Sequence, residues 1–83
     1  MKLDMLYFAR LKDSFGMATE QLETEAASVD ELLTELRQRG GHWSSELAAG
    51  KAFRVARNQE LVRLDATLSD GDEIAIFPPV TGG

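Results

Sequence analysis

The first hydrophobic segment, residues 2–9 (KLDMLYFA), carries apolar side chains at both alternations of an extended chain. One face would hold Leu3, Met5 and Tyr7, and the other would hold Leu6 and Phe8. A strand with apolar residues on both faces is typically covered on both sides. We therefore expect a strand with the core on one face, and something else over part of the face that carries Phe8.

The clearest helical pattern follows Ser28. The apolar residues that recur there at helical spacing are Val29, Leu32, Leu33 and Leu36. Ser28 and Glu31 form the pattern of a capping box, and Gly40 suits a left-handed helix stop. We expect the main helix within residues 28–41, so termination of this helix accounts for the internal Gly40-Gly41 pair.

Shorter elements are predicted on either side of this helix. They are a short helical or turn segment at 10–16, a strand pairing back on the first at 17–26, a helical turn at 42–50, two strands at 52–64 about a turn at Asn58-Gln59, a tight turn at 69–73 and a last strand at 74–77. One main helix among several strands predicts an α+β fold, with a single sheet packed on the helix.

The composition is that of one small globular domain. A chain of 83 residues buries roughly 60% of the surface that its unfolded form exposes, which leaves no room for a buried catalytic cleft of ordinary size. The longest uncharged apolar run is too short to span a bilayer. The N-terminal segment contains Asp4 and lacks a small-residue cleavage site, so it does not resemble a signal peptide. We expect a cytoplasmic location.

The sequence has no cysteine and a net charge of −5. The first fact excludes disulfides, thiolate metal sites, a cysteine nucleophile and a cysteine persulfide. The second disfavours nucleic acid and anionic membranes, because both require clustered Lys and Arg. A protein partner with a basic surface fits this charge better.

No local motif indicates a metal site or an active site of the chain's own. His42 has no accompanying ligand set, and residues 69–73 (SDGDE) lack the ligand positions of a calcium loop. Ser44 and Ser45 have no neighbouring base that would activate them as nucleophiles.

The C-terminal segment FPPVTGG is the sharpest feature of the sequence. Pro78 and Pro79 remove two backbone donors, so the last strand must stop there, and Val80 and Thr81 favour an extended chain. Gly82 and Gly83 would make a probe thin enough for a channel as wide as the backbone alone. We expect a domain at 1–78 followed by an extended tail at 79–83.

If the carboxylate of Gly83 is the functional group, it must first be activated, most simply as an acyl-adenylate. The activated group could be joined to an amine, or it could take up sulfide and become a thiocarboxylate. The second fate would give a chain without cysteine a means of carrying nucleophilic sulfur, but the composition does not choose between them. Phe8 and Phe77, on strands that are apolar on both faces, could anchor a partner or form a small cluster within the monomer.

Three segments carry a resemblance to a known family. LYFARLKDSFG near the start, VARNQELV in the middle and LSDGDEIAIFPPVTGG at the end resemble the small, sulfur-carrier subunit of molybdopterin synthase, a ubiquitin-like β-grasp protein. The resemblance extends over essentially the whole chain, and the ending is its most specific part. Arg57 departs from the pattern, since an apolar residue would be expected there.

The resemblance implies that a ubiquitin-activating-like adenylyltransferase adenylates Gly83, which then becomes a thiocarboxylate. The tail from Pro79 to Gly83, including Val80, Thr81 and Gly82, would enter the large synthase subunit and donate sulfur to cyclic pyranopterin monophosphate, forming the molybdopterin dithiolene. It further implies a heterotetramer of two small and two large subunits, with Phe8, Phe77 and Leu61 at the interface. In that complex the chain is a sulfur donor without a catalytic site or a permanently bound cofactor.

Three alternatives remain open from the sequence. A sulfur carrier of the thiazole pathway shares the terminal Gly-Gly, and a ubiquitin-like modifier would be joined to lysines through Gly83. A plain β-grasp interaction module would use neither Gly82 nor Gly83.

Overall fold

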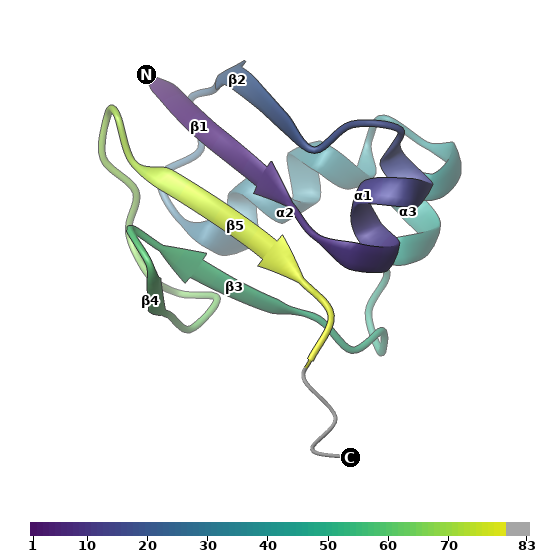
Figure 1. The fold of residues 1–83 in the computed structure, drawn as a ribbon. Coiled ribbons are helices and arrows are strands. Elements are labelled where there is room, and N and C mark those ends of the chain that lie inside the picture. Colours follow the sequence, from purple (N-terminus) through teal and green to yellow (C-terminus); the bar gives the residue numbers. More distant parts are fainter. Residues whose placement is uncertain (80–83) are drawn as a thin grey trace.

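A computed structural model describes residues 1–79 and shows a five-stranded mixed sheet with three helices (Figure 1). The elements in chain order are β1 (Lys2–Tyr7), α1 (Ala9–Phe15), β2 (Thr19–Glu23), α2 (Val29–Arg37), α3 (Gly41–Glu46), β3 (Arg54–Arg57), β4 (Glu60–Leu61) and β5 (Glu73–Phe77). The strand order is β2-β1-β5-β3-β4. The two central strands, β1 and β5, run parallel, and every other neighbouring pair is antiparallel.

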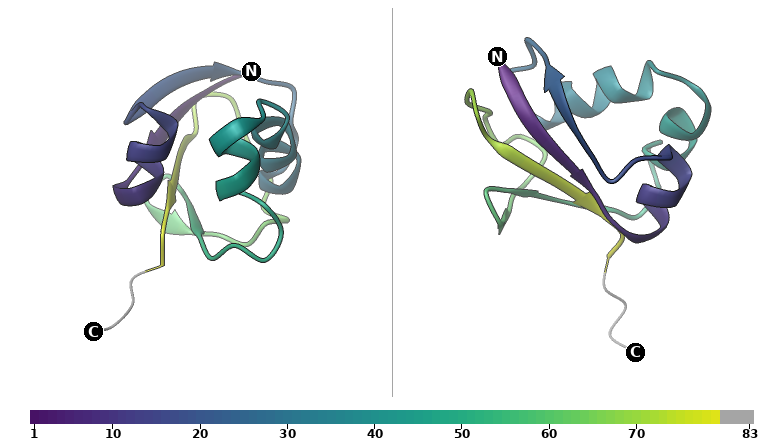
Figure 2. Two further views of the ribbon diagram at one scale, coloured as in Figure 1. Left: turned by 90° about the vertical axis from the view of Figure 1, so that its right-hand side faces the viewer. Right: turned by 45° about the horizontal axis from the view of Figure 1, so that its top comes forward.

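Helices α2 and α3 lie on one side of the sheet, and α1 lies at the end of the sheet, beyond the end of β1, so that no helix covers the middle of the other face (Figure 1 and Figure 2). The core between sheet and helices contains fully buried side chains from β1, β5 and α2, among them Leu3, Met5, Leu33 and Ile74. The α+β arrangement expected from the sequence is therefore confirmed, with one main helix and short additional helices. We call the face without helices the outer face.

Helix α2 begins as its sequence predicts. The Ser28 Oγ accepts a hydrogen bond from the Glu31 backbone N–H at 3.3 Å, and Asp30 and Glu31 occupy the positive end of the helix. All four residues of the predicted apolar stripe are fully buried. The predicted left-handed stop at Gly40 is wrong, because α2 ends at Arg37 with Gln38 as a right-handed C-cap. Gly40 has a φ of 75° and is instead the N-cap of α3.

Strand β1 is shorter than the sequence predicted, because it ends at Tyr7. Phe8 still has an extended backbone and donates its N–H to the Ile76 carbonyl at 3.2 Å. Ala9 then adopts a φ of 53°, a left-handed conformation that no strand can continue through. The chain turns there into α1, which ends at Gly16 with a φ of 73°, as predicted.

Two predicted turns lie together at the end of the sheet remote from Phe8. Asn58 and Gln59 join β3 to β4 with φ values of 51° and 72°, and two positive φ values are typical of a type I′ hairpin turn. The Asn58 side chain donates to Asp72 Oδ1 at 3.0 Å and accepts the Glu73 N–H at 3.0 Å. The hairpin is therefore tied to the turn at residues 69–72 that leads into β5.

Strand β5 is the last element of the described chain. It ends at Phe77, and Pro78 and Pro79 follow outside the sheet. Whether residues 1–78 and 79–83 behave as domain and tail stays a prediction. Within residues 1–79, every helix is too short and too polar to cross a bilayer.

Candidate functional site

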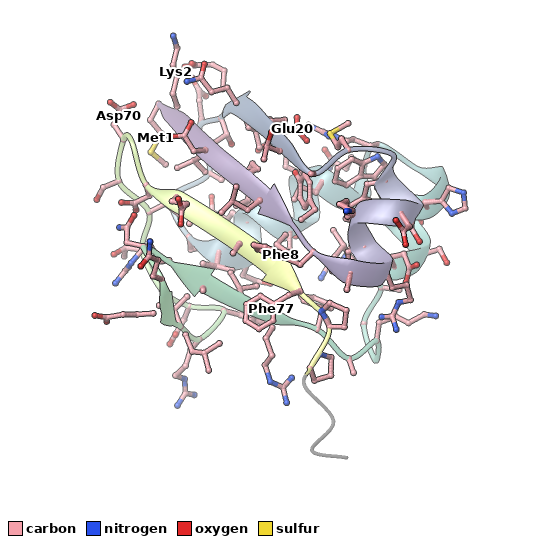
Figure 3. The ribbon with its side chains drawn as sticks, in the orientation of Figure 1. Met1, Lys2, Phe8, Glu20, Asp70 and Phe77 are labelled. Atoms are coloured by element: carbon pink, nitrogen blue, oxygen red, sulfur yellow. The ribbon has the colours of Figure 1, made fainter. Side chains whose placement is uncertain are left out.

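Two aromatic residues from the ends of the central strands lie together on the outer face. Phe8 follows β1 and Phe77 closes β5, and their rings meet edge to face with centroids 6.5 Å apart (Figure 3). Phe8 is 48% exposed, and Phe77 is half-buried. The sequence left two interpretations open, a small cluster within the monomer and an anchor for a partner. The rings contact each other, as in a cluster, and they still leave an aromatic surface uncovered that a partner could contact.

An apolar row crosses the outer face beside this pair. The register places Leu6 next to Ala75, Ala75 next to Ala56, and Ala56 next to Leu61. Their sequence neighbours Met5, Ile74 and Val55 point into the core, so the row points away from it. Leu61 is 67% exposed. The structure therefore places Phe8, Phe77 and Leu61, the three residues expected at a partner interface, on one face of the sheet.

The predicted tail begins beside this surface. Pro78 and Pro79 follow Phe77 directly and cannot donate to a neighbouring strand, so the ladder stops at the aromatic pair. Pro79 is half-buried. The remaining tail residues of the prediction, Val80, Thr81, Gly82 and Gly83, lie outside the described residues.

A polar network behind Phe8 was not predicted from the sequence. The Tyr7 hydroxyl donates to Glu20 Oε2 at 2.8 Å, and the Arg39 guanidinium donates to both Glu20 oxygens at 2.8 and 3.0 Å. Arg39 also lies 4.4 Å above the Trp43 ring centroid, and Trp43 stacks on Phe15 with centroids 3.8 Å apart. This network connects β1, β2 and the segment after α2, so it fixes the end of the strand from which Phe8 projects.

The protonation states of the network follow from its geometry. Burial opposes ionisation of Glu20, but the hydrogen bonds from Arg39 and Tyr7 together outweigh it and hold the pKa of that carboxyl below its usual value. Burial raises the pKa of Tyr7 strongly, and its hydrogen bond to Glu20 raises it further. Tyr7 therefore remains a neutral donor to a charged carboxylate.

The amino-acid sequence alone gives only weak indications of this network. From the sequence alone, Arg39 is only a cation near a helix end, and Trp43 is only an aromatic residue of a kind common in cores. Trp43 is in fact only partly buried, because one side of its ring packs on the core and Arg39 lies over the other. Arg57, which departs from the family pattern, donates from Nη1 to the Thr67 carbonyl at 2.6 Å and so fastens the loop before β5.

Between Met1 and Pro79, no three His, Cys, Asp or Glu side chains are grouped so that they could hold a metal ion. His42, Ser44 and Ser45 are exposed and lie on α3. The features of the outer face are those of a docking surface: exposed aromatic and aliphatic side chains beside the start of the tail.

Comparison with known proteins identifies the family. The model of the ThiS family matches residues 5–83. The chain belongs to the ThiS family. It is 42% identical over 81 residues to the molybdopterin synthase sulfur carrier subunit of Haemophilus influenzae, a match that covers 98% of this chain and 99% of that protein.

Solved structures support the same fold. The structure of SAMP1, a small archaeal modifier protein from Haloferax volcanii, superposes with a TM-score of 0.84 at 28% identity, with all of both chains covered. A chain in the complex of subunits 1 and 2 of molybdopterin-converting factor from Helicobacter pylori superposes with a TM-score of 0.70 at 27% identity, again over both whole chains. The ubiquitin-like β-grasp fold expected from the resemblance is confirmed.

Proposed function

We propose that this chain is the sulfur-carrier subunit of a molybdopterin synthase and that it carries sulfur as a thiocarboxylate on Gly83. The observation that carries the proposal is the whole-length identity of 42% to a protein of that name. The aromatic pair next to Pro78 and Pro79, of which Phe8 is exposed and Phe77 half-buried, supports it, because a carrier must dock on a partner at the point where its tail leaves the domain.

The chemistry of a carrier without cysteine follows from the carboxylate. An activating enzyme would transfer AMP from ATP to the Gly83 carboxylate, releasing pyrophosphate and forming an acyl-adenylate. Sulfide would then displace AMP from the acyl-adenylate, leaving the thiocarboxylate. Its sulfur would form a bond to a pyranopterin carbon as an oxygen substituent of that carbon leaves. Water would then hydrolyse the resulting thioester, so that sulfur remains on the product and Gly83 returns as a carboxylate.

This proposal assigns two successive partners to one surface. The first is a ubiquitin-activating-like adenylyltransferase, and the second is the large synthase subunit, whose active site would receive Pro79 to Gly83. A 2+2 heterotetramer would hold one carrier at each active site. Because the dithiolene contains two sulfurs and each carrier brings one, each product requires two loaded carriers. The complex of subunits 1 and 2 from Helicobacter pylori supports a large-subunit partner.

No cofactor is permanently bound in this proposal, because the acyl-adenylate and the thiocarboxylate are transient covalent states of Gly83. The large subunit would supply the basic groups that bind the anionic pyranopterin, and the net charge of −5 on the carrier suits such a partner. We place the reaction in the cytoplasm, where ATP is available to the activating enzyme.

Mass spectrometry of the chain produced with its native activating machinery tests the proposal. Trypsin should release residues 64–83, a peptide without Met, Trp or Cys, so oxidation of those residues cannot imitate the exchange of oxygen for sulfur. We expect that exchange on Gly83 and its loss after reaction with the pyranopterin and the large subunit. The variant lacking Gly83 should fold normally and transfer no sulfur, and normal turnover by this variant would refute the mechanism.

A protein-modifier function is the second candidate, and the similarity to SAMP1 favours it. It predicts adducts of lower electrophoretic mobility on other proteins that require Gly83, under conditions in which no sulfur reaches the pyranopterin. Transfer to a thiazole precursor instead would identify the thiazole-pathway carrier. A plain interaction module would keep its partner binding and its function without Gly82 and Gly83.

A further inference from the structure

Positive charge gathers in one segment of this acidic chain. Residues 47–64 contain Lys51, Arg54, Arg57 and Arg63 against the single carboxylate Glu60, a net charge of +3. The whole chain carries −5, so the remaining residues together carry −8. This segment therefore differs in sign from the rest of the molecule.

Three of these cations surround a hollow with an apolar floor. The hollow has a volume of about 280 Å³ and lies between residues 51–55, which lead into β3, and residues 62–64, which follow β4. Lys51, Arg54 and Arg63 line it together with the apolar side chains of Phe53, Val62 and Leu64. The Val62 N–H donates to the Val55 carbonyl at 3.1 Å, where the two segments meet. We call this hollow the basic groove.

The cations of the basic groove are free to bind a further group. Arg63 has its nearest carboxylate, Asp65, at 3.9 Å, and both side chains are more than 80% exposed, so solvent screens the pair. Arg54 donates to the Phe53 carbonyl at 3.0 Å and, like Lys51, forms no ion pair with any carboxylate within residues 1–79. By contrast, Arg39 is held by two hydrogen bonds to Glu20.

The basic groove is continuous with the aromatic surface at the start of the tail. Arg54 lies beside Phe77 in the register of β3 and β5, so the groove begins one strand away from the aromatic pair. Leu64 at its floor is 45% exposed. A partner that covers Phe8 and Phe77 could therefore also contact the basic groove, because the two surfaces adjoin.

We infer that the basic groove binds an acidic segment of the large synthase subunit, an inference that rests on the proposed function. Carboxylates of that segment would pair with Lys51 and Arg63, and an apolar side chain between them would cover Phe53 and Leu64. The charge of the groove selects an acidic segment, and its apolar floor selects a peptide rather than a small anion. This second contact would fix the rotation of the carrier about its tail, which the aromatic pair alone leaves free.

A matched pair of variants tests this inference. Lys51→Glu/Arg63→Glu reverses two groove charges and leaves Arg54, beside Phe77, unchanged. Lys2→Glu/Lys12→Glu makes the same change in net charge at two exposed lysines outside residues 47–64. We expect calorimetric titration with the large subunit at low salt to show binding about tenfold weaker for the groove variant than for the control. The difference should shrink at high salt, because ions screen exposed charges.

Carbodiimide cross-linking of the wild-type complex adds a direct readout, since this reagent joins an amine to a carboxylate in contact with it. We expect Lys51 to be linked to an Asp or Glu of the large subunit. Equal binding by the two variants, in a complex that still forms, would overturn the groove inference and leave the proposed function standing. Linkage of Lys51 to a second copy of this chain would overturn it in favour of self-association, and failure of the wild type to bind the large subunit would overturn both.

Discussion

The Arg39 guanidinium donates hydrogen bonds to both carboxylate oxygens of Glu20, at 2.8 and 3.0 Å, across 19 positions of sequence. The same carboxylate accepts the Tyr7 hydroxyl, and Tyr7 is the residue before Phe8. The ion pair therefore stabilises the strand end that presents the candidate docking surface, and it connects folding stability to the geometry of that surface.

We predict that Glu20→Gln destabilises the fold by about 1–3 kcal/mol. The substitution removes the charge that Arg39 pairs with and leaves the buried Tyr7 hydroxyl with a weaker acceptor. Urea unfolding followed by circular dichroism measures the change. Glu25→Gln, at an exposed carboxylate of the next loop, is the control and should shift stability by no more than about 0.5 kcal/mol. Equal effects of the two variants would show that the network contributes nothing specific.

The stabilisation by Glu20 should depend on pH. Its pKa is lower in the folded than in the unfolded protein, so its contribution is complete above the unfolded value near 4.3 and is lost as the pH falls through the folded value. Glu46, whose pKa is lowered by the hydrogen bond from Ser14, titrates in the same direction. We therefore compare wild type with Glu20→Gln: their difference in unfolding free energy should be largest above about pH 5 and should vanish in stronger acid. A difference independent of pH would contradict this account.

The local elements could be predicted because their signals are local. Ser28 and Glu31 cap α2, Gly16 ends α1, and the Asn58-Gln59 turn joins two strands, each through contacts within a few residues. The sequence did not predict that β1 ends at Tyr7, because the residue type alanine does not indicate that the backbone of Ala9 is left-handed. The resemblance to a β-grasp family, rather than any periodicity, indicated how the strands are arranged.

The sequence likewise predicted some residues of the candidate site and missed others. Phe8 and Phe77 could be found because each belongs to a sequence segment that is apolar at both alternations of an extended chain, and Leu61 because the resemblance indicated it. The Glu20–Arg39 pair could not be found, because it forms from segments that only the fold brings together, and the predicted hairpin at 52–64 did not indicate that a hollow lies between its two strands. The sequence shows where charges lie along the chain, but it does not show that Lys51 and Arg63 line one hollow.

We predict that Gln59→Gly stabilises the protein by about 0.5–1 kcal/mol. Gln59 has a φ of 72°, which strains a residue with a Cβ and suits glycine, and its exposed side chain forms no hydrogen bond with residues 1–79. Thermal or urea unfolding measures the gain. The control is Gln21→Gly, the same change at an exposed position within β2, which should destabilise because glycine weakens a strand interior. Destabilisation by both variants would mean that the turn does not hold Gln59 in this conformation.

The last prediction concerns the aromatic pair. Phe8→Ala and Phe77→Ala should each weaken binding of the large subunit by about tenfold or more, because exposed aromatic anchors contribute most at interfaces. Phe8→Ala should lower folding stability only slightly, since its ring is already 48% exposed. The rings contact each other, so the double variant should lose less binding energy than the sum of the single losses.

A core phenylalanine supplies the comparison for these variants. Phe15→Leu removes aromatic packing beneath Trp43 and should reduce folding stability while leaving the affinity of the folded molecules unchanged. Calorimetry with the large subunit and unfolding curves for each variant separate the two effects. If Phe8→Ala and Phe77→Ala instead behave like Phe15→Leu, with lower stability and unchanged affinity, the pair is an internal cluster and the docking surface must lie elsewhere. If the pair is a docking surface, Phe8→Ala and Phe77→Ala should lower the affinity for the large subunit while the folding stability stays nearly constant.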